Sequence, residues 1–325
     1  MKILLIPRKD VEGILSMKEV MDAVENAFRY KALGKVQMPP KLYVMFPKGD
    51  FRTMPCYIPD LGFGGVKIVN VHPENPAKYN LPTIMALIIL IEPETGKPLA
   101  IMDGTWITNM RTGAAGGVAA MYLARKDSKV IGMVGAGTQA RAQLLALNEV
   151  FDIDEVKVYS RRLEDCERFK KDMAYLGLNI SIKGRVEDAV RGCDILVTTT
   201  PVTQPIVENE WVDEGMHINA IGADAPLKEE LDPRILKRAK IVVDDVEQAI
   251  HSGEINVPIS KGIISRDDIY AELGEIVAGK KAGRVSDSEI TIFDSTGLAI
   301  QDLATATLIY KKAKEACLGS EVELL

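Results

Sequence analysis

The order of hydrophobic and polar residues changes character near residue 129 of the chain. Before it, the capping pair Ser16 and Glu19 and a run of apolar residues at helical spacing predict a helix that ends near Gly34. Alternating segments then favour strands at residues 42–46, 51–57, 65–71, 84–91 and 99–102, with turn chemistry at 93–96 between the last two. These elements predict an α+β amino-terminal domain.

After residue 129, short apolar segments alternate with segments that favour helices. The candidate strands are 130–134, 155–159, 179–182, 194–199, 217–221 and 240–244. This alternation predicts an α/β fold with a doubly wound parallel sheet of the Rossmann class, in which ligands bind at the carboxyl ends of the strands. A last helix near residues 298–317 has room to return to the first domain. We expect one domain of residues 1–112 and 305–325, and a dinucleotide-binding domain of residues 113–304.

A glycine-rich turn follows the first strand of the second domain. Its pattern is G-x-G-x-x-A, with Gly135, Gly137 and Ala140 at the defined positions. Gly135 permits the tight turn, Gly137 lets the backbone approach a pyrophosphate, and Ala140 lets the helix pack close to the strand. Because a strand precedes the turn and a complete βαβ unit surrounds it, the pattern favours a dinucleotide site over an ordinary turn.

Small residues also dominate residues 111–121, between the two domains. We interpret this segment, beginning at Arg111, as the start of a helix. Its composition suits close packing of the backbone against a ligand or, equally well, against a neighbouring helix.

Composition and charge narrow the class of protein. The 325 residues are 47% hydrophobic and 26% charged, with a net charge of −6, which is typical of a soluble globular protein and argues against nucleic acid as a partner. The cysteines form no C-x-x-C pair and the histidines no cluster with ligand spacing, so we expect reduced thiols and no metal. The longest apolar run, residues 81–91, is too short to span a membrane, so we expect a cytoplasmic protein without a membrane partner.

The residues after the second Rossmann strand bear on the choice of cofactor. An acidic residue at this point usually binds the ribose 2′-hydroxyl of NAD, whereas this chain has Ser160, Arg161 and Arg162. A hydroxyl and two guanidinium groups suit a 2′-phosphate, because arginine binds phosphate oxygens through paired, charge-assisted hydrogen bonds. We expect NAD(P) with a preference for NADP(H). The alternative is that the arginines begin a solvated helix.

Lys67 is a candidate for acid–base chemistry. Strand alternation places it on the same face as Val69 and Val71. Burial there would lower the pKa of its amine, so that it could give and take a proton near neutral pH. On the sequence alone, an edge-strand lysine with its amine in water is the preferred alternative.

Two arginines and one aspartate complete the candidates. Arg52 and Arg111 could bind a carboxylate, because a guanidinium meets a carboxylate in a fork geometry, although each could instead form a surface salt bridge. Asp224 follows a parallel strand near the expected nicotinamide and could orient a water or an amine. Alternatively, it could cap a helix that begins at Pro226.

At these residues the chain resembles the ornithine cyclodeaminase and mu-crystallin family, and within it the alanine dehydrogenase branch of archaea. The matching segments are residues 38–41, 52–55, 105–117, 218–224, 242–245, 253–255, 293–297 and the glycine-rich turn. The resemblance implies that the first domain is a substrate-binding and dimerisation domain, through which the chain forms a homodimer, and that the active site lies between the domains. It also implies that Lys67 is the proton donor and acceptor, that Arg52 and Arg111 bind the substrate carboxylate, and that Asp224 handles water or the amine.

The resemblance also implies that Lys228 and Ser295 lie near the cofactor. Leu227 stands where family members often have glycine, just before Lys228. The expected cofactor-binding residues are Arg111, Thr112, Gly135, Gly137, Thr138, Gln139, Ser160, Arg161, Arg162, Thr200, Ala223, Asp224, Lys228 and Ser295.

The activity that the resemblance implies is an NAD(P)-dependent L-alanine dehydrogenase, which interconverts alanine with pyruvate and ammonia. The alternatives are an ornithine or lysine cyclodeaminase, a cyclic ketimine reductase such as a pyrroline-2-carboxylate reductase, and a cofactor-loaded binding protein without turnover. The presence of Lys67, Arg52, Arg111 and Asp224 together argues against the last of these. The expected partner is therefore a small amino or keto acid.

Overall fold

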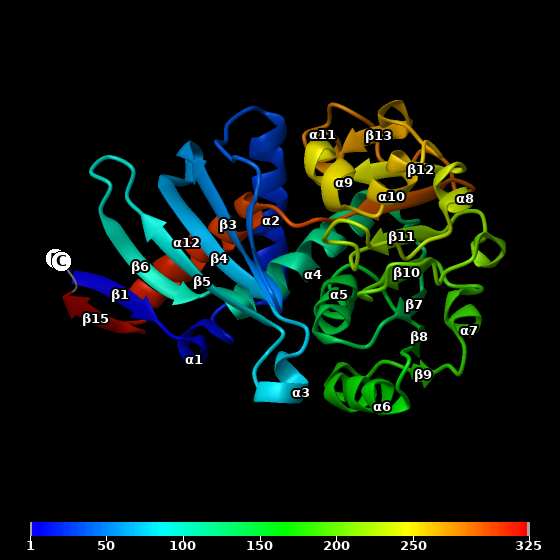
Figure 1. Cartoon of the computed structure of the whole chain (residues 1–325), viewed down its shortest axis with the longest axis horizontal. Coiled ribbons are helices and arrows are strands. Elements are labelled where there is room, and N and C mark those ends of the chain that lie inside the picture. Colours follow the sequence, from blue (N-terminus) through cyan, green and yellow to red (C-terminus); the bar gives the residue numbers. More distant parts are fainter. Residues whose placement is uncertain (1, 324–325) are drawn as a thin grey trace. The chain divides into compact units, whose positions relative to one another are not determined.

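The structure is a computed structural model that describes residues 2–323, which divide into two compact units. The first unit comprises the residues up to Arg111 together with those from Leu298 onward, and the second comprises Thr112–Gly297 (Figure 1). The first division falls inside helix α4 (Gly104–Leu123), and the second falls just ahead of helix α12 (Ala299–Glu315).

The first unit is built on a seven-stranded mixed sheet. Its strand order is β15 (Ser320–Glu323), β1 (Lys2–Ile6), β6 (Pro98–Asp103), β5 (Ile84–Ile91), β4 (Phe63–Val71), β3 (Gly49–Ile58) and β2 (Leu42–Phe46). The five predicted strands form the antiparallel run from β2 to β6, and β1 and β15 are strands that the sequence analysis missed. Two short helices, α1 (Arg8–Val11) and α3 (Asn75–Tyr79), lie in its connections.

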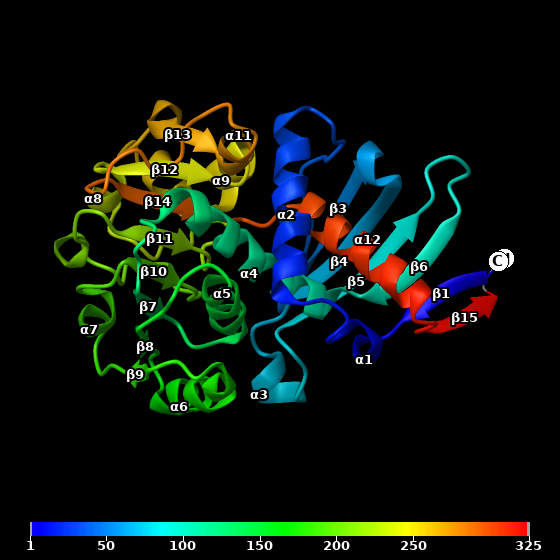
Figure 2. The ribbon, with the colours of Figure 1, turned by 180° about the vertical axis from the view of Figure 1, so that it is seen from behind.

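Two long helices pack on this sheet. Helix α2 (Met17–Ala32) begins as predicted, because Ser16 Oγ accepts a hydrogen bond from the Glu19 amide while the Glu19 carboxylate accepts one from the Ser16 amide. Helix α12 contacts α2 and crosses β3, β4 and β5 (Figure 2). The prediction that the last helix returns to the amino-terminal strands is therefore confirmed.

The second unit contains an eight-stranded sheet in which every neighbouring pair is parallel. Its strand order is β13 (Ile269–Glu272), β12 (Ala239–Val243), β14 (Ile290–Asp294), β11 (His217–Ala220), β10 (Ile195–Thr198), β7 (Val130–Val134), β8 (Glu155–Tyr159) and β9 (Ile180–Ile182). The connecting helices are α5 (Thr138–Asn148), α6 (Leu163–Asp172), α7 (Val186–Val190), α8 (Pro233–Leu236), α9 (Val246–Ser252), α10 (Asn256–Ser260) and α11 (Leu273–Val277). The doubly wound fold is thus confirmed, and the strand order reverses between β7 and β10.

Apolar side chains cover both faces of the parallel sheet. Leu196 and Ile218 belong to one buried cluster, while Ile131 and Met133 belong to the cluster on the other face. Strands that are buried on both sides have continuous apolar sequences rather than alternating ones, as these do. This core fixes the carboxyl ends of the strands, where a ligand would bind.

Helix α4 corrects one prediction. It begins at Gly104, directly after β6, where the Asp103 carboxylate accepts a hydrogen bond from the Trp106 amide, so Arg111 lies in mid-helix and not at a helix start. Its small residues pack against a helix: a Cβ at Gly113 would lie 2.3 Å from the Ala142 carbonyl oxygen of α5. Of the two alternatives left open for this segment, the helix contact is the one observed within the second unit.

Candidate active site

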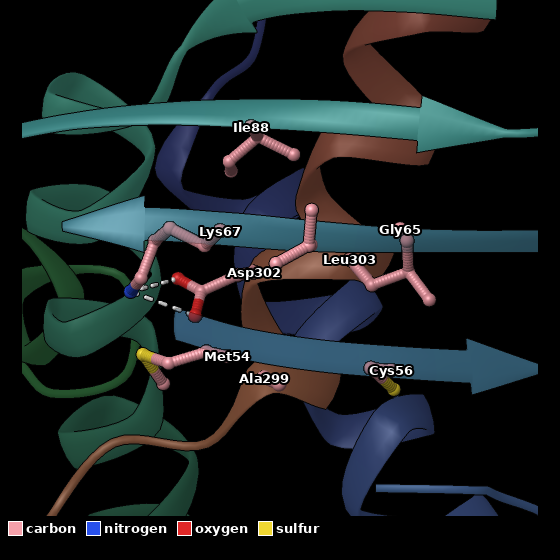
Figure 3. Close-up of a pocket in the computed structure, with 9 residues that line it drawn as sticks. Met54, Cys56, Gly65, Lys67, Ile88, Ala299, Asp302 and Leu303 are labelled. Atoms are coloured by element: carbon pink, nitrogen blue, oxygen red, sulfur yellow. Dashed lines mark hydrogen bonds and ion pairs between the residues drawn. The ribbon is translucent and has the colours of Figure 1, made fainter. Parts of the chain in front are cut away.

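Lys67 lies in the interior of the first unit. On β4 it is opposite Met54 of β3 and Ile88 of β5, and its side chain is only 1% exposed. The alternative of a water-facing edge lysine is therefore wrong. Its Nζ lies 2.7 Å from both carboxylate oxygens of Asp302, which α12 projects onto this face of the sheet (Figure 3).

The surroundings of Lys67 set its protonation. Burial, and secondarily the charge of Arg111, lowers the pKa of Lys67 to about 7, whereas Asp302 acts in the opposite direction. An amine with such a pKa can both donate and accept a proton near neutral pH, as a general acid or base must.

Arg111 shares the same carboxylate. Its Nε donates to Asp302 Oδ1 at 2.9 Å, and its Nη1 donates to Gln301 Oε1 at 2.9 Å. Gln301 Oε1 also accepts from the Leu298 amide at the head of α12, which fixes its position. The Arg111 side chain is 7% exposed, so the surface salt-bridge alternative is wrong. Two cations around one carboxylate form a buried cluster that would attract an anionic group.

The sequence analysis missed Asp302 and Gln301. A signal for Asp302 exists in the sequence, because it is an acidic residue within a stretch of small and apolar residues from Ala299 to Ala306. An acidic side chain on a buried helix face needs a cationic partner unless backbone amides donate to it. That partner is 235 positions away in the chain, which the local pattern does not reveal.

Arg52 lies on the same sheet face but has a different partner. It is opposite Val69 on β4, two residues along from Lys67, and it is buried. Its Nε donates to Asp50 at 2.9 Å, and its guanidinium lies 5.0 Å from the ring centre of Tyr43. Its surface salt-bridge alternative is also wrong. The side chains that line the pocket beside Lys67 are mainly apolar: Met54, Cys56, Val66, Ile88, Ala299 and Leu303 (Figure 3).

In the second unit, the glycine-rich turn has the shape that a dinucleotide requires. Gly135 has φ +111°, and a Cβ there would lie 2.4 Å from Thr199 Oγ1, at the point where the strand order reverses. At Gly137 a Cβ would meet no atom within 4 Å, so the space next to this backbone is open. Helix α5 then starts at Thr138 without a side-chain cap, which leaves its first amides for an anion. These residues fit a pyrophosphate.

Two buried hydroxyls just beyond the carboxyl ends of these strands have no hydrogen-bond partner among residues 2–323. They are Thr199 Oγ1, after β10, and Ser295 Oγ, after β14. Unpaired hydroxyls in a buried position indicate that a polar ligand completes the site. Of the other expected cofactor-binding residues, Thr112 is buried with its carbonyl bonded to Gln143, and Gln139 lies in the first turn of α5.

The residues after β8 divide into two groups. Arg162 forms a bidentate pair with Asp165 in the first turn of α6, at 2.8 and 2.9 Å, as the solvated-helix alternative requires. Arg161 is exposed and forms no hydrogen bond or ion pair with any residue that the structure describes. Ser160 is partly buried beside it. Arg161 is therefore the guanidinium that remains available to a ligand.

Asp224 pairs with Lys228 across a short loop, with Lys228 Nζ 2.5 Å from Asp224 Oδ1. No helix begins here, so the helix-cap alternative is wrong. Leu227 has φ +70° and is 72% exposed, which means that it keeps the left-handed conformation for which glycine is suited. The substitution changes the surface of the loop and preserves its backbone path.

Between residues 2 and 323 there is no group of three histidine, cysteine, aspartate or glutamate side chains that could hold a metal ion. In the same range, no helix is both long enough and apolar enough to cross a membrane.

A doubly wound sheet with a dinucleotide turn, together with a buried lysine of lowered pKa, defines an oxidoreductase of the Rossmann class. The chain belongs to the ornithine cyclodeaminase/mu-crystallin family, which it matches over residues 2–316. It is 57% identical over 323 residues to the alanine dehydrogenase of Archaeoglobus fulgidus, covering 99% of each chain.

Solved structures of related proteins agree with this assignment. A dimeric archaeal alanine dehydrogenase with bound NAD superimposes with a TM-score of 0.97, at 56% identity and with full coverage of both chains. The Δ1-pyrroline-2-carboxylate reductase of Thermococcus litoralis, solved with NADH and L-proline, superimposes with a TM-score of 0.96 at 42% identity, covering 98% of this chain and 100% of that one. The predicted family and the predicted oxidoreductase class are therefore confirmed.

Proposed function

We propose that the protein is a nicotinamide-dependent L-alanine dehydrogenase, which converts alanine and water to pyruvate and ammonia and also runs the reverse reductive amination. One observation carries this proposal: the buried cluster of Lys67, Asp302 and Arg111, in a chain that is 57% identical to an alanine dehydrogenase. The cluster places a titratable amine next to a guanidinium. The guanidinium can bind the carboxylate of an amino acid, and the amine can exchange a proton with its amino group.

The residues of the chain have distinct roles in this reaction. A bound nicotinamide supplies the acceptor for the hydride that leaves Cα of alanine. Arg52 and Arg111 bind the carboxylate, so that the substrate is held in one orientation. Lys67 takes a proton from the substrate ammonium group before hydride loss and returns one during hydrolysis of the imine. Asp224 positions the water that adds to the imine carbon, after which the C–N bond breaks and ammonia leaves.

The charges of the first unit favour a substrate with a small apolar side chain. The negative charge of Asp302 already compensates the positive charges of Lys67 and Arg111, and Asp50 already forms an ion pair with Arg52. The second ammonium of ornithine or lysine would need an anionic partner, and neither carboxylate is available for it. Apolar side chains such as that of Met54 pack beside Lys67 instead.

A second candidate is a reductase of cyclic imines. The relative from T. litoralis that was solved with NADH and L-proline is 42% identical over nearly the whole chain. Reduction of a cyclic imine needs the same carboxylate binding and the same proton donor, but no added water. The two activities therefore differ in their need for Asp224.

The test follows the absorbance of the reduced cofactor with three substrates: pyruvate plus ammonia, Δ1-pyrroline-2-carboxylate, and ornithine with product analysis. Oxidation of the cofactor with pyruvate and ammonia supports the dehydrogenase. Faster turnover of the cyclic imine would replace it with the reductase, and redox-neutral release of ammonia from ornithine would replace it with a cyclodeaminase. Tight cofactor binding without any turnover would make the protein a binding protein.

We also propose that NADP(H) is preferred, with Arg161 binding the 2′-phosphate. Arg161 is exposed, and no described side chain engages it, whereas Arg162 is paired with Asp165. Arg161→Ala should weaken NADPH binding roughly tenfold or more and leave NADH binding unchanged, because it removes a charge-assisted contact. The matched control is Arg162→Ala, which should change neither the NADPH affinity nor the NADH affinity. A wild-type protein that binds NADH more tightly than NADPH would contradict the preference.

A homodimer is the proposed assembly, as in the archaeal relative solved as a dimer. The sheet of the first unit exposes apolar side chains on the face opposite Lys67, where Leu42, Ile68 and Leu87 are 64%, 39% and 53% exposed in one row across the strands. Such a patch is typical of an interface between copies. Leu87→Lys should give a monomer in sedimentation velocity, while the control Leu163→Lys, on α6, should not.

A further inference from the structure

Glu230 joins two loops at the carboxyl edge of the parallel sheet. These are the β10 loop, residues 199–201, and the β11 loop, residues 221–224, which follow neighbouring strands. Glu230 Oε1 accepts hydrogen bonds from both the amide and the hydroxyl of Thr200, each at 2.6 Å. Its Oε2 accepts one from the Gly222 amide at 2.9 Å. One carboxylate therefore holds both loops.

The fit around this carboxylate is tight. Glu230 has no exposed surface, and a Cβ at Gly222 would lie 2.4 Å from Glu230 Oε2 and 2.3 Å from the Thr200 carbonyl oxygen. A side chain at position 222 would force the loops apart, so glycine is needed there for close approach.

The backbone of Glu230 is itself anchored. Its amide donates to Glu254 Oε1 at 2.8 Å, and its carbonyl accepts from the amides of Ile206 and Val207. Glu254 also accepts from the Leu231 amide at 2.6 Å. A side chain whose own backbone is fixed on both sides can determine where its partners lie.

Thr200 in the β10 loop and Ala223 in the β11 loop are expected cofactor-binding residues, and the proposed function assigns Asp224 of the β11 loop to the chemistry. Lys228, which pairs with Asp224, also donates to the Gly222 carbonyl at 3.3 Å. From this geometry we propose that Glu230 is a positioning residue, which sets the β10 and β11 loops for the nicotinamide half of the cofactor without touching it. This inference rests on the proposed nicotinamide cofactor and does not depend on which substrate is used.

The test compares binding of NADH with binding of ADP-ribose, which lacks the nicotinamide half. Glu230→Gln keeps the shape of the side chain but turns an amide NH₂ toward one of the loop donors. NADH affinity should fall roughly tenfold, the usual effect of losing a hydrogen bond to a charged group, while ADP-ribose affinity stays within about twofold. Equal losses for both ligands, or no loss for either, would overturn the proposal.

Asp194→Asn is the matched control. Asp194 also accepts two backbone hydrogen bonds, from the amides of Lys129 and Val130 at 2.8 and 2.9 Å, but it lies at the amino ends of the strands. The Asp194→Asn variant should have a lower melting temperature and an unchanged ratio of NADH affinity to ADP-ribose affinity. If this control changed the ratio as Glu230→Gln does, general destabilisation would explain both variants and the positioning role would be wrong.

Gly222→Ala provides a second route if Glu230→Gln fails to fold, because the added methyl group displaces the same carboxylate from the loop side. It should give the same selective loss of NADH affinity, and an unchanged ratio would overturn the proposal. The two proposals fail separately. Inactivity of the wild type with pyruvate and ammonia would overturn only the proposal of an alanine dehydrogenase. An unchanged ratio of NADH to ADP-ribose affinity in these variants would overturn only the positioning role of Glu230.

Discussion

The two units bury their ionisable side chains in opposite ways. In the first unit, the carboxylate of Asp302 is compensated by two cations, Lys67 and Arg111. In the second unit, Glu230 and Glu254 are equally buried, and their oxygens accept hydrogen bonds mainly from backbone amides. One cluster is balanced by opposite charge, and the other by peptide dipoles.

This difference has a consequence for protonation. Burial raises the pKa of Glu230, and burial together with the nearby Glu230 carboxyl raises the pKa of Glu254 well above its usual range. In the first unit burial instead lowers the pKa of Lys67, to about 7. Both shifts have the same physical cause, because a buried site favours the neutral form of any group. The first cluster is therefore suited to moving protons, and the second to holding loops.

The largest expected effect is loss of catalysis in Lys67→Met. Removing the proton carrier should lower kcat by about 10²–10⁴-fold. NADH affinity should not change, because the glycine-rich turn lies elsewhere in the chain. Lys311→Met, which replaces a lysine of α12 beside the Phe63 ring, is the control and should retain full activity. Steady-state kinetics with pyruvate and ammonia measure both variants, and a Lys67→Met protein with wild-type kcat would rule out the assigned role.

Asp302→Asn tests the balance of the first cluster. The Asp302 charge raises the pKa of Lys67, so its removal should move the inflection of the kcat/KM profile from near pH 7 to lower pH. The same variant should lose roughly 3–5 kcal/mol of stability, because it leaves buried cations without their counter-charge. The pH profile and denaturant unfolding measure the two effects. An inflection that stayed in place or moved upward would mean that Asp302 does not control Lys67.

The lowered pKa of Lys67 also predicts how stability depends on pH. Between pH 7 and pH 9 the unfolded lysine carries a proton and the folded one has largely lost it, so the free energy of unfolding contributed by this residue rises with pH. The slope is about 1.4 kcal/mol per pH unit. Unfolding of the first unit can be followed by Trp106 fluorescence in a Trp211→Phe background. The wild type should gain stability relative to Lys67→Met over this range, and parallel curves would contradict the prediction.

Much of the fold could be predicted from hydrophobic periodicity. Strands β2, β5, β7 and β8 have the predicted bounds, because each is a clear run of alternating or buried residues between turns. Strands β1, β13, β14 and β15 were missed for different reasons. β14 is buried at every position and shows no alternation, whereas β15 is a short polar strand that pairs only with β1 at the edge of the sheet.

The site was predictable only where local pattern determines it. Alternation along β4 placed Lys67 on the face of Val69 and Val71, although the sequence alone favoured an amine in water, and the glycine pattern located the turn after β7. Asp302 and Glu230 were missed because their function depends on partners that are distant in the chain, 235 residues away for Lys67 and 30 for Thr200. Tertiary packing, which brings α12 onto the sheet, creates the first cluster.

Glu254→Gln, for which we expect the smallest effect, tests the second cluster. Because the pKa of Glu254 is raised on folding, the folded protein binds its proton more tightly than the unfolded chain, and stability falls as pH rises above about 4.5. Glutamine resembles the protonated acid and removes this dependence. The variant should therefore equal the wild type near pH 4.5 and be the more stable of the two at neutral pH. Denaturant unfolding followed by Trp211 fluorescence in a Trp106→Phe background measures this. A variant that became less stable than the wild type as pH rose would show that Glu254 is held as a carboxylate, and the contrast between the two units would then be wrong.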